Sequence, residues 1–145
     1  MKNSKRLLII GIALFVLDQL SKYIVRTLIE PFQSLPVINN IFHITFVQNT
    51  GALFGMFKGF NFVFIWLTII ALGFILFYWD KFPKKFVVRL FLVLIVVGLI
   101  GNLIDRIFFG YVIDFLDFRI WPVFNLADSL VSAGVVGLVF SYVRK

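Results

Sequence analysis

The sequence predicts an all-α membrane protein, a bundle of four transmembrane helices with a small extracytoplasmic β-rich segment between the first and second helices. Hydrophobic residues make up 61% of the 145 residues, whereas soluble domains contain about 45–50%. The mean hydropathy is +1.04, and a soluble domain of this size has too little interior to bury such a surplus. The charged residues are few and stand at the ends of long apolar runs. Lipid is therefore the expected surrounding of these runs.

The expected spans are residues 7–29, 60–79, 90–109 and 123–143. The first follows basic residues, as a secretory signal would, but no small-x-small cleavage site follows it, so we interpret it as a retained helix. The second contains about twenty residues without a charge, the length that crosses the hydrocarbon core. No repeat or linker divides the chain, and residues 1–145 are expected to form a single domain.

Lysines and arginines indicate the orientation of the spans. They cluster at the amino terminus, between residues 81 and 89, and at the carboxyl terminus. The outer segments each contain one basic residue, Lys58 in residues 30–59 and Arg119 in residues 110–122. Because basic loops stay inside, both termini are expected on the cytoplasmic side of the membrane. This distribution also argues against a nucleic-acid partner, since the basic residues form no single patch.

The first outer segment contains its own structural signals. Residues 41–47 are rich in strand-forming side chains. Pro31 and Pro36 are expected to end the helix before them, and Gly51, Gly55 and Gly59 to permit turns. A short β-rich segment is therefore expected here.

The first span contains an acid and a base on one helix face. Asp18 and Lys22 are four residues apart, so their side chains are neighbours. An ionisable residue at bilayer depth costs about 2.5–3.5 kcal/mol and is usually paired or functional. A buried ion pair that only fixes helix packing and a contribution to a functional site are both compatible with this spacing.

The third and fourth spans repeat an Asn-x-x-Asp spacing, as Asn102 with Asp105 and Asn125 with Asp128. At 1.5 Å per residue, Asp105 lies about 24 Å across the membrane, near the outer interface. Asp128 lies close to the outer end of its span, and Asp114 belongs to the connection between the two spans. These three carboxylates are expected at one depth on the outer side.

The residue inventory limits the chemistry. One histidine, His43, and one glutamate are too few for a metalloprotease motif, and cysteine is absent. Ser21 and Lys22 are adjacent and point about 100° apart on a helix, which disfavours a Ser-Lys dyad. Carboxylates are therefore the remaining candidates for catalytic groups. Two of them in a low-dielectric site share a proton, so one can activate water while the other protonates a leaving amide. This chemistry needs no metal and no cofactor.

Five motifs resemble those of the lipoprotein signal peptidase (signal peptidase II) family, in the family's order and along nearly the whole chain. They are Asp18-Gln19-Leu20-Ser21-Lys22, Asn49-Thr50-Gly51-Ala52-Leu53-Phe54, Gly101-Asn102-Leu103-Ile104-Asp105-Arg106, Val112-Ile113-Asp114-Phe115 and Phe124-Asn125-Leu126-Ala127-Asp128. Each motif alone is weak, but the ordered set is specific. The stretch 115–127 is shorter than is typical of the family.

The resemblance implies an intramembrane aspartyl endopeptidase that cleaves diacylglyceryl-prolipoproteins before their lipidated cysteine. It implies Asp114 and Asp128 as the catalytic pair, an outer segment that forms a cradle and flap, and inhibition by globomycin-like cyclic peptides. The expected supporting residues are Asp18, Lys22, Asn49, Gly51, Asn102, Asp105, Arg106 and Asn125. Asp105, next to Arg106, is expected to be a permanently ionised structural acceptor. The resemblance also implies that the protein lies in the cytoplasmic (inner) membrane of a bacterium, with the active site toward the extracytoplasmic side. Membrane lipids are expected partners, and the protein is expected to be a monomer.

Two other functional classes remain open from the residues alone. A proton- or ion-coupled small transporter or channel subunit also uses intramembrane carboxylates, although it would distribute them across the bilayer. A structural four-span scaffold would use the polar residues only for helix packing, and would tolerate asparagine at Asp114 and Asp128.

Overall fold

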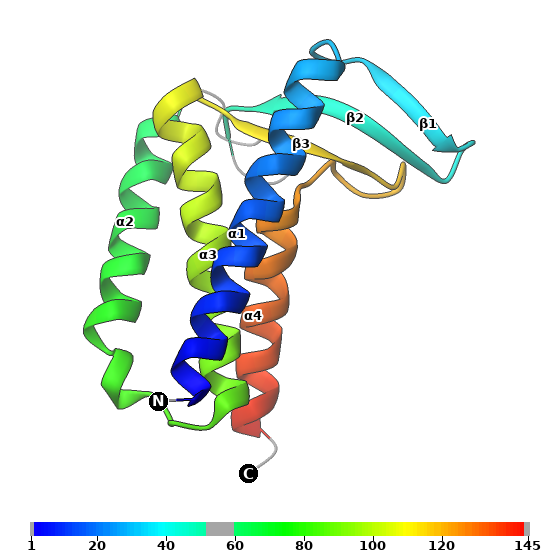
Figure 1. Cartoon of the computed structure of the whole chain (residues 1–145). Coiled ribbons are helices and arrows are strands. Elements are labelled where there is room, and N and C mark those ends of the chain that lie inside the picture. Colours follow the sequence, from blue (N-terminus) through cyan, green and yellow to red (C-terminus); the bar gives the residue numbers. More distant parts are fainter. Residues whose placement is uncertain (1, 52–59, 144–145) are drawn as a thin grey trace.

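A computed structural model describes residues 2–51 and 60–143 (Figure 1). Within them the chain forms a helical bundle with a three-stranded sheet at one end. The elements, in chain order, are α1 (Lys2–Leu28), β1 (Ser34–Ile38), β2 (Phe42–Asn49), α2 (Asn61–Phe77), the 3-10 helix η2 (Trp79–Lys81), α3 (Phe86–Phe109), β3 (Val112–Asp117) and α4 (Leu126–Val143). Both termini lie at the end of the bundle opposite the sheet.

The helices match the expected apolar runs, with shifts at their ends. Three of the described helices, α1, α3 and α4, are long and apolar enough to cross a membrane. Helix α2 is apolar but has 17 residues, which is shorter than the roughly 20 needed for a perpendicular crossing. Helix α3 ends where Gly110 adopts a left-handed conformation with φ of 79°, a common helix stop because glycine has no Cβ to clash. The conformation of Gly110 therefore defines where α3 ends.

The sheet differs from the sequence expectation in its third strand. Its order is β1-β2-β3 and both pairings are antiparallel. β3 comes from the connection between α3 and α4, so the β-rich structure is not confined to the segment between the first two helices. The run Val112–Asp117 is rich in β-branched and aromatic residues, and places Asp114 opposite Val47.

Pro36 lies within β1, opposite His43, and not in an irregular segment that only ends the first helix. Because β1 is an edge strand, a residue without a backbone N–H can be accommodated there. The pairing of β1 with β2 is irregular between Pro36 and Ile38.

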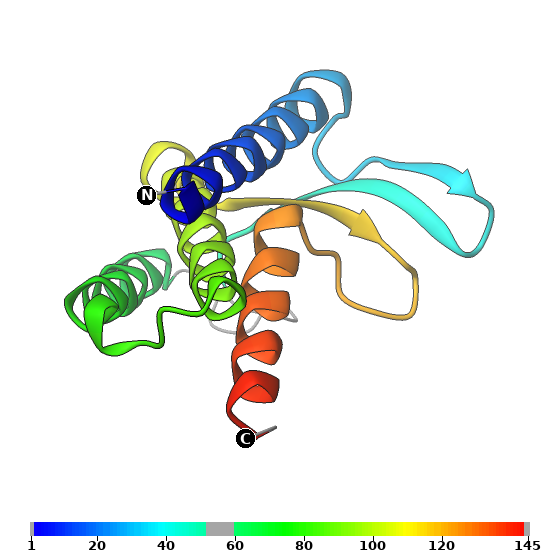
Figure 2. The same ribbon diagram turned by 60° about the horizontal axis from the view of Figure 1, so that its bottom comes forward.

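An apolar cluster fixes the sheet on the bundle. Val25 and Ile29 from the end of the first helical segment pack with Phe46 of β2 and with Ile113 and Phe115 of β3, and all five are buried. Helix α3 lies between α2 on one side and α1 and α4 on the other (Figure 2). This arrangement brings together β3, the start of α4 and the half of α3 nearer the sheet.

Candidate active site

Asp114 is held in the middle of β3, and its side chain is only 1% exposed. Asn49 Nδ2 donates a hydrogen bond to its Oδ2 over 2.8 Å, and Asn125 Nδ2 donates to its Oδ1 over 2.6 Å. Burial raises the pKa of Asp114 to about 7, and the nearby charge of Asp128 acts in the same direction. The two amide donors oppose this shift because they favour the carboxylate. Asp114 can therefore carry a proton near neutral pH.

Asp128 lies in the first turn of α4 and forms a reciprocal cap with Asn125. The backbone N–H of Asp128 donates to Asn125 Oδ1 over 2.9 Å, and the backbone N–H of Asn125 donates to Asp128 Oδ2 over 3.3 Å. This pattern resembles a capping box. In that motif, the side chain of the residue at the helix start accepts the backbone N–H of the residue three positions later, whose side chain accepts the first residue's backbone N–H in return. The second Asn-x-x-Asp spacing therefore has a local structural cause, which also positions both side chains.

Asn102 of α3 connects the buried charges to Asp128. Its Oδ1 accepts hydrogen bonds from Lys22 Nζ and from Asn125 Nδ2, both over 3.1 Å. Both groups are donors, so the amide oxygen must face them and Nδ2 must face the other way. Asn102 Nδ2 donates to Asp128 Oδ1 over 2.7 Å. The orientation of this amide is thus fixed by Lys22 and Asn125.

Lys22 is buried between two carboxylates. Its Nζ lies 3.0 Å from Asp18 Oδ2 and 2.8 Å from Asp105 Oδ2. Asp18 Oδ1 accepts the backbone N–H of Ala127 over 2.9 Å, which satisfies one of the unpaired N–H groups at the start of α4. Asp105 Oδ2 also accepts the backbone N–H of Ile113 over 3.3 Å. This network joins α1, α3, β3 and α4.

The cation that contacts Asp105 is Lys22 and not its sequence neighbour Arg106. Arg106 Nη2 donates to the carbonyl oxygen of Gly51 over 3.4 Å, and its guanidinium lies 5.3 Å from the centre of the Phe64 ring. Consecutive positions on a helix point in different directions. Arg106 therefore points toward Gly51 and α2, whereas Asp105 points toward Lys22. The rest of the Asn49-Phe54 motif, from residue 52, lies outside the described residues, as do Gly55 and Gly59.

Two polar residues near the site were not singled out from the sequence. Gln19 Nε2 donates to Asp18 Oδ2 over 3.0 Å and to the carbonyl oxygen of Gly101 over 3.3 Å. Asp117, three residues after Asp114, accepts hydrogen bonds from Thr45 and Arg119. Gln19 is part of the Asp18 motif and could have been found there. The partners of Asp117 depend on sheet pairing, which no local pattern indicates.

The arrangement is a carboxyl group that can retain a proton at neutral pH and that accepts from the side chain of Asn125, next to a second carboxyl group that accepts from the backbone N–H of the same residue. Such a pair can transfer protons to and from a reacting group. Within residues 2–51 and 60–143, no group of three or more His, Cys, Asp or Glu side chains is arranged to hold a metal ion.

A family model described as signal peptidase (SPase) II matches residues 10–144. The chain belongs to the signal peptidase II family. A lipoprotein signal peptidase of Halothermothrix orenii is 47% identical over 131 residues, which cover 90% of each chain. One of Moorella thermoacetica is 47% identical over 130 residues, covering 89% of this chain and 87% of the relative. A solved bacterial membrane enzyme superposes with a TM-score of 0.89 at 30% identity, covering 97% of this chain and 88% of the other.

Membership of the signal peptidase II family makes the chain an aspartic-type protease that processes lipoprotein signal peptides, and an integral membrane protein. The resemblance noted from the five motifs is confirmed. The transporter and scaffold alternatives receive no support from these relatives.

Proposed function

We propose that the protein removes signal peptides from diacylglyceryl-modified prolipoproteins, cleaving before the lipidated cysteine, and that Asp114 and Asp128 are its catalytic pair. The observation that carries this proposal is that Asn125 contacts two carboxyl groups: its side-chain Nδ2 donates to Asp114, a buried group with a pKa of about 7, and its backbone N–H donates to Asp128 at the start of α4. A pair that holds one proton can use its ionised member as a base and its neutral member as an acid.

In the proposed reaction, the ionised carboxylate takes a proton from a water molecule that attacks the scissile carbonyl carbon. The neutral carboxyl group donates a hydrogen bond to the carbonyl oxygen, and a proton then passes to the leaving nitrogen as the carbon–nitrogen bond breaks. Asn49, Asn102 and Asn125 hold the two carboxyl groups in place. No covalent intermediate forms, and no cofactor takes part.

The proposed membrane arrangement has four spans, both termini in the cytoplasm and the catalytic pair near the outer surface. It is supported by the position of both termini at the end of the bundle opposite the sheet and by the basic residues near that end. The diacylglyceryl chains of the substrate can then stay in lipid while the scissile bond reaches the carboxylates. Each buried CH₂ contributes about 0.8 kcal/mol of binding. We further propose that the protein acts as a monomer and is inhibited by globomycin-like cyclic peptides.

The proposal is tested by cleavage of a lipidated precursor by purified protein in detergent. Asp114→Asn and Asp128→Asn are each expected to lower kcat by at least about a thousandfold, because the effects of residues that act as a unit are each nearly complete. Asp117→Asn is the matched control, since Asp117 is on the same strand but faces Thr45 and Arg119. It should retain near wild-type kcat.

Asp105→Asn distinguishes the proposed pair, Asp114 and Asp128, from the alternative pair of Asp105 and Asp128. Asp105 accepts hydrogen bonds from Lys22 and from Ile113, so its substitution should lower the amount of folded protein more than kcat per folded molecule. If folded Asp114→Asn protein cleaved at near wild-type rate while folded Asp105→Asn protein were inactive, the pair would be Asp105 and Asp128. An unlipidated precursor should be cleaved far less efficiently, and equal turnover would contradict the proposed substrate.

A further inference from the structure

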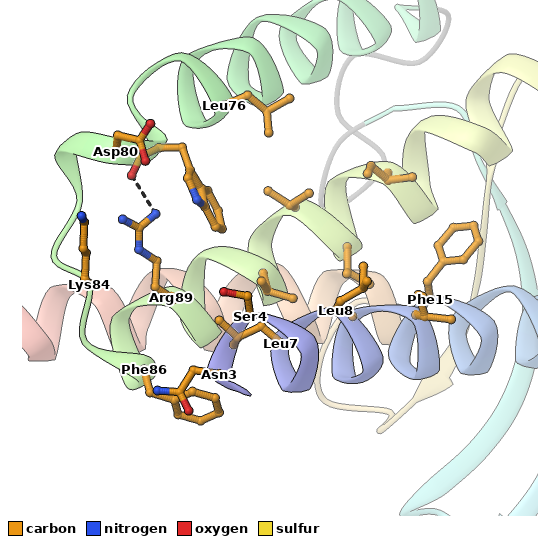
Figure 3. A pocket seen from close by; sticks show the side chains of 17 residues that line it. Asn3, Ser4, Leu7, Leu8, Phe15, Leu76, Asp80, Lys84, Phe86 and Arg89 are labelled. Atoms are coloured by element: carbon orange, nitrogen blue, oxygen red, sulfur yellow. Dashed lines mark hydrogen bonds between the residues drawn. The ribbon is translucent and has the colours of Figure 1, made fainter. Parts of the chain in front are cut away.

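A long cavity lies at the end of the bundle that carries the termini, remote from the candidate active site. It has a volume of about 940 Å³ and is lined by residues of α1, the end of α2, α3 and the segment that joins α2 to α3 (Figure 3). Its lining includes none of the residues that we assign to catalysis or its support. The proposed peptidase mechanism therefore leaves this cavity unexplained.

The cavity has the depth of one bilayer leaflet. Its wall runs along α1 from Asn3 to Phe15 and along α3 from Phe86 to Ile100. At 1.5 Å per residue these stretches are about 18 and 21 Å long, close to half of the roughly 40–45 Å bilayer with its headgroup regions. A transmembrane segment of a substrate would need a groove across the full thickness. A lipid acyl chain needs only this depth.

The cavity is apolar along its length and polar at one end. Leu8 and Phe15 belong to the apolar wall, whereas Ser4, Asp80 and Lys84 lie toward the polar end (Figure 3). This gradient, from a polar mouth into an apolar interior, is the one that a phospholipid presents from its headgroup to its tail.

Arg89 fixes the wall at the polar end. It is buried, donates from Nη1 to the carbonyl oxygen of Trp79 over 2.8 Å, and donates from Nη2 to the carbonyl oxygen of Phe82 over 2.9 Å. Its guanidinium also lies 4.8 Å from the centre of the Trp79 ring. These contacts hold the segment between α2 and α3 against α3. They therefore fix this wall of the cavity, which includes Trp79.

The charge at the mouth favours an anionic occupant. Lys84 lines the cavity and is exposed, and Lys81 and Lys85 are its neighbours in the chain. Asp80 is the acidic residue in the lining. Basic residues at a membrane surface attract anionic lipids. The same charges repel the positively charged amino-terminal region of a signal peptide.

We propose that this cavity binds one anionic phospholipid, with an acyl chain along α1 and α3 and the phosphate beside Lys84. The site does not depend on the identity of the catalytic pair. It would hold α2 against the rest of the bundle from the side that carries the termini.

Fluorescence of Trp79 provides the test. In a full-length variant with Trp66→Phe and Trp121→Phe, Trp79 is the remaining tryptophan. Phosphatidylglycerol and phosphatidylcholine with brominated acyl chains are compared as quenchers in mixed micelles with the unbrominated lipids. The relative affinity at Trp79 is expected to favour phosphatidylglycerol at least threefold. Equal affinities would overturn the proposal.

Paired variants in the same background locate the site. Lys84→Glu should abolish the preference for phosphatidylglycerol, whereas Lys81→Glu, outside the lining, should keep it. Leu8→Phe, which narrows the cavity, should reduce quenching by both lipids, whereas Ile9→Phe should not; the two parent residues are similarly exposed, at 64% and 66%. If both lysine variants lost the preference for phosphatidylglycerol equally, the cause would be general attraction to a basic surface, and the proposed binding site would be refuted. Precursor cleavage by each variant reports that it is folded, and tests the peptidase proposal separately.

Discussion

Asn125 donates a hydrogen bond from Nδ2 to Oδ1 of Asp114 over 2.6 Å, across the junction between α4 and β3. The same side chain accepts the backbone N–H of Asp128 through Oδ1. One buried amide therefore caps a helix and orients a carboxyl group on a strand. Because the two ends of the amide have different partners, its two roles can be separated by substitution.

Asn125→Ser should preserve the cap and remove the side-chain donor to Asp114 and to Asn102. Serine is among the preferred residues at a helix start, but its shorter side chain cannot also donate to Asp114. A hydrogen bond to a charged group is worth about 1.5–3 kcal/mol, so we expect kcat to fall about ten- to a hundredfold with a modest loss of thermal stability. Asn39→Ser, in an exposed turn, serves as the control. An unchanged kcat in folded Asn125→Ser would show that the contact to Asp114 is dispensable.

The activity should fall as the pH rises above about 7. Burial and the charge of Asp128 raise the pKa of Asp114 to about 7, and the proposed mechanism needs one proton on the pair. Loss of that proton at higher pH leaves two anions and no acid. The pH profile of kcat/KM for a lipidated precursor in detergent measures this limb. A rate that stays constant from pH 6 to pH 9 would contradict a proton held at Asp114.

Stability should respond to pH in opposite directions at two aspartates of the same strand. The raised pKa of Asp114 means that the folded state binds its proton more tightly than the unfolded state does, so its contribution to stability falls as the pH rises from about 4 to about 7. Asp114→Asn should therefore raise the unfolding temperature at pH 8, and much less at pH 4.

Asp117 provides the opposite case. Although burial acts to raise its pKa, hydrogen bonds from Thr45 and Arg119 hold the pKa below its usual value. Its stabilising contribution is present above pH 4 and is lost as the pH falls through the folded-state pKa. Asp117→Asn should lower the unfolding temperature at pH 8 but have less effect near pH 3. Equal shifts for both variants at all pH values would contradict these assignments.

The apolar runs and the polar motifs could be identified in the sequence, but the contacts between residues distant in the chain could not. Hydrophobic length located the helices to within a few residues, because burial in lipid imposes one dominant requirement. The expected partner of Asp105 was its neighbour Arg106, yet the structure pairs it with Lys22, 83 positions away. β3 was missed because its strand partner, β2, lies two helices earlier in the chain. Long-range pairing of this kind leaves no local pattern.

Substitution of Lys22 should destabilise the protein by leaving two buried acids without their cation. Lys22→Met keeps the side-chain length while unpairing Asp18 and Asp105, and breaking a buried ion pair typically costs about 3–5 kcal/mol. The double variant Lys22→Met with Asp105→Asn removes one of the stranded charges. It should therefore be more stable than Lys22→Met alone, as coupled sites are non-additive. Thermal unfolding in detergent measures the difference, and additive losses would show that the two residues are not coupled.

The proposed orientation can be tested by labelling, because the chain contains no cysteine. Single cysteines at Ser34, at the start of β1, and at Gly110, after α3, replace exposed residues on the sheet side of the bundle. A cysteine at Pro83 lies in the segment between η2 and α3, on the side of the termini. In intact cells, a membrane-impermeant thiol reagent should label the first two positions and spare the third, and permeabilised cells should show labelling at all three. Labelling of Pro83→Cys alone in intact cells would invert the orientation. Labelling of all three positions in intact cells would mean that neither α2, with its 17 residues, nor α3 separates the two sides. The four-span arrangement would then be wrong.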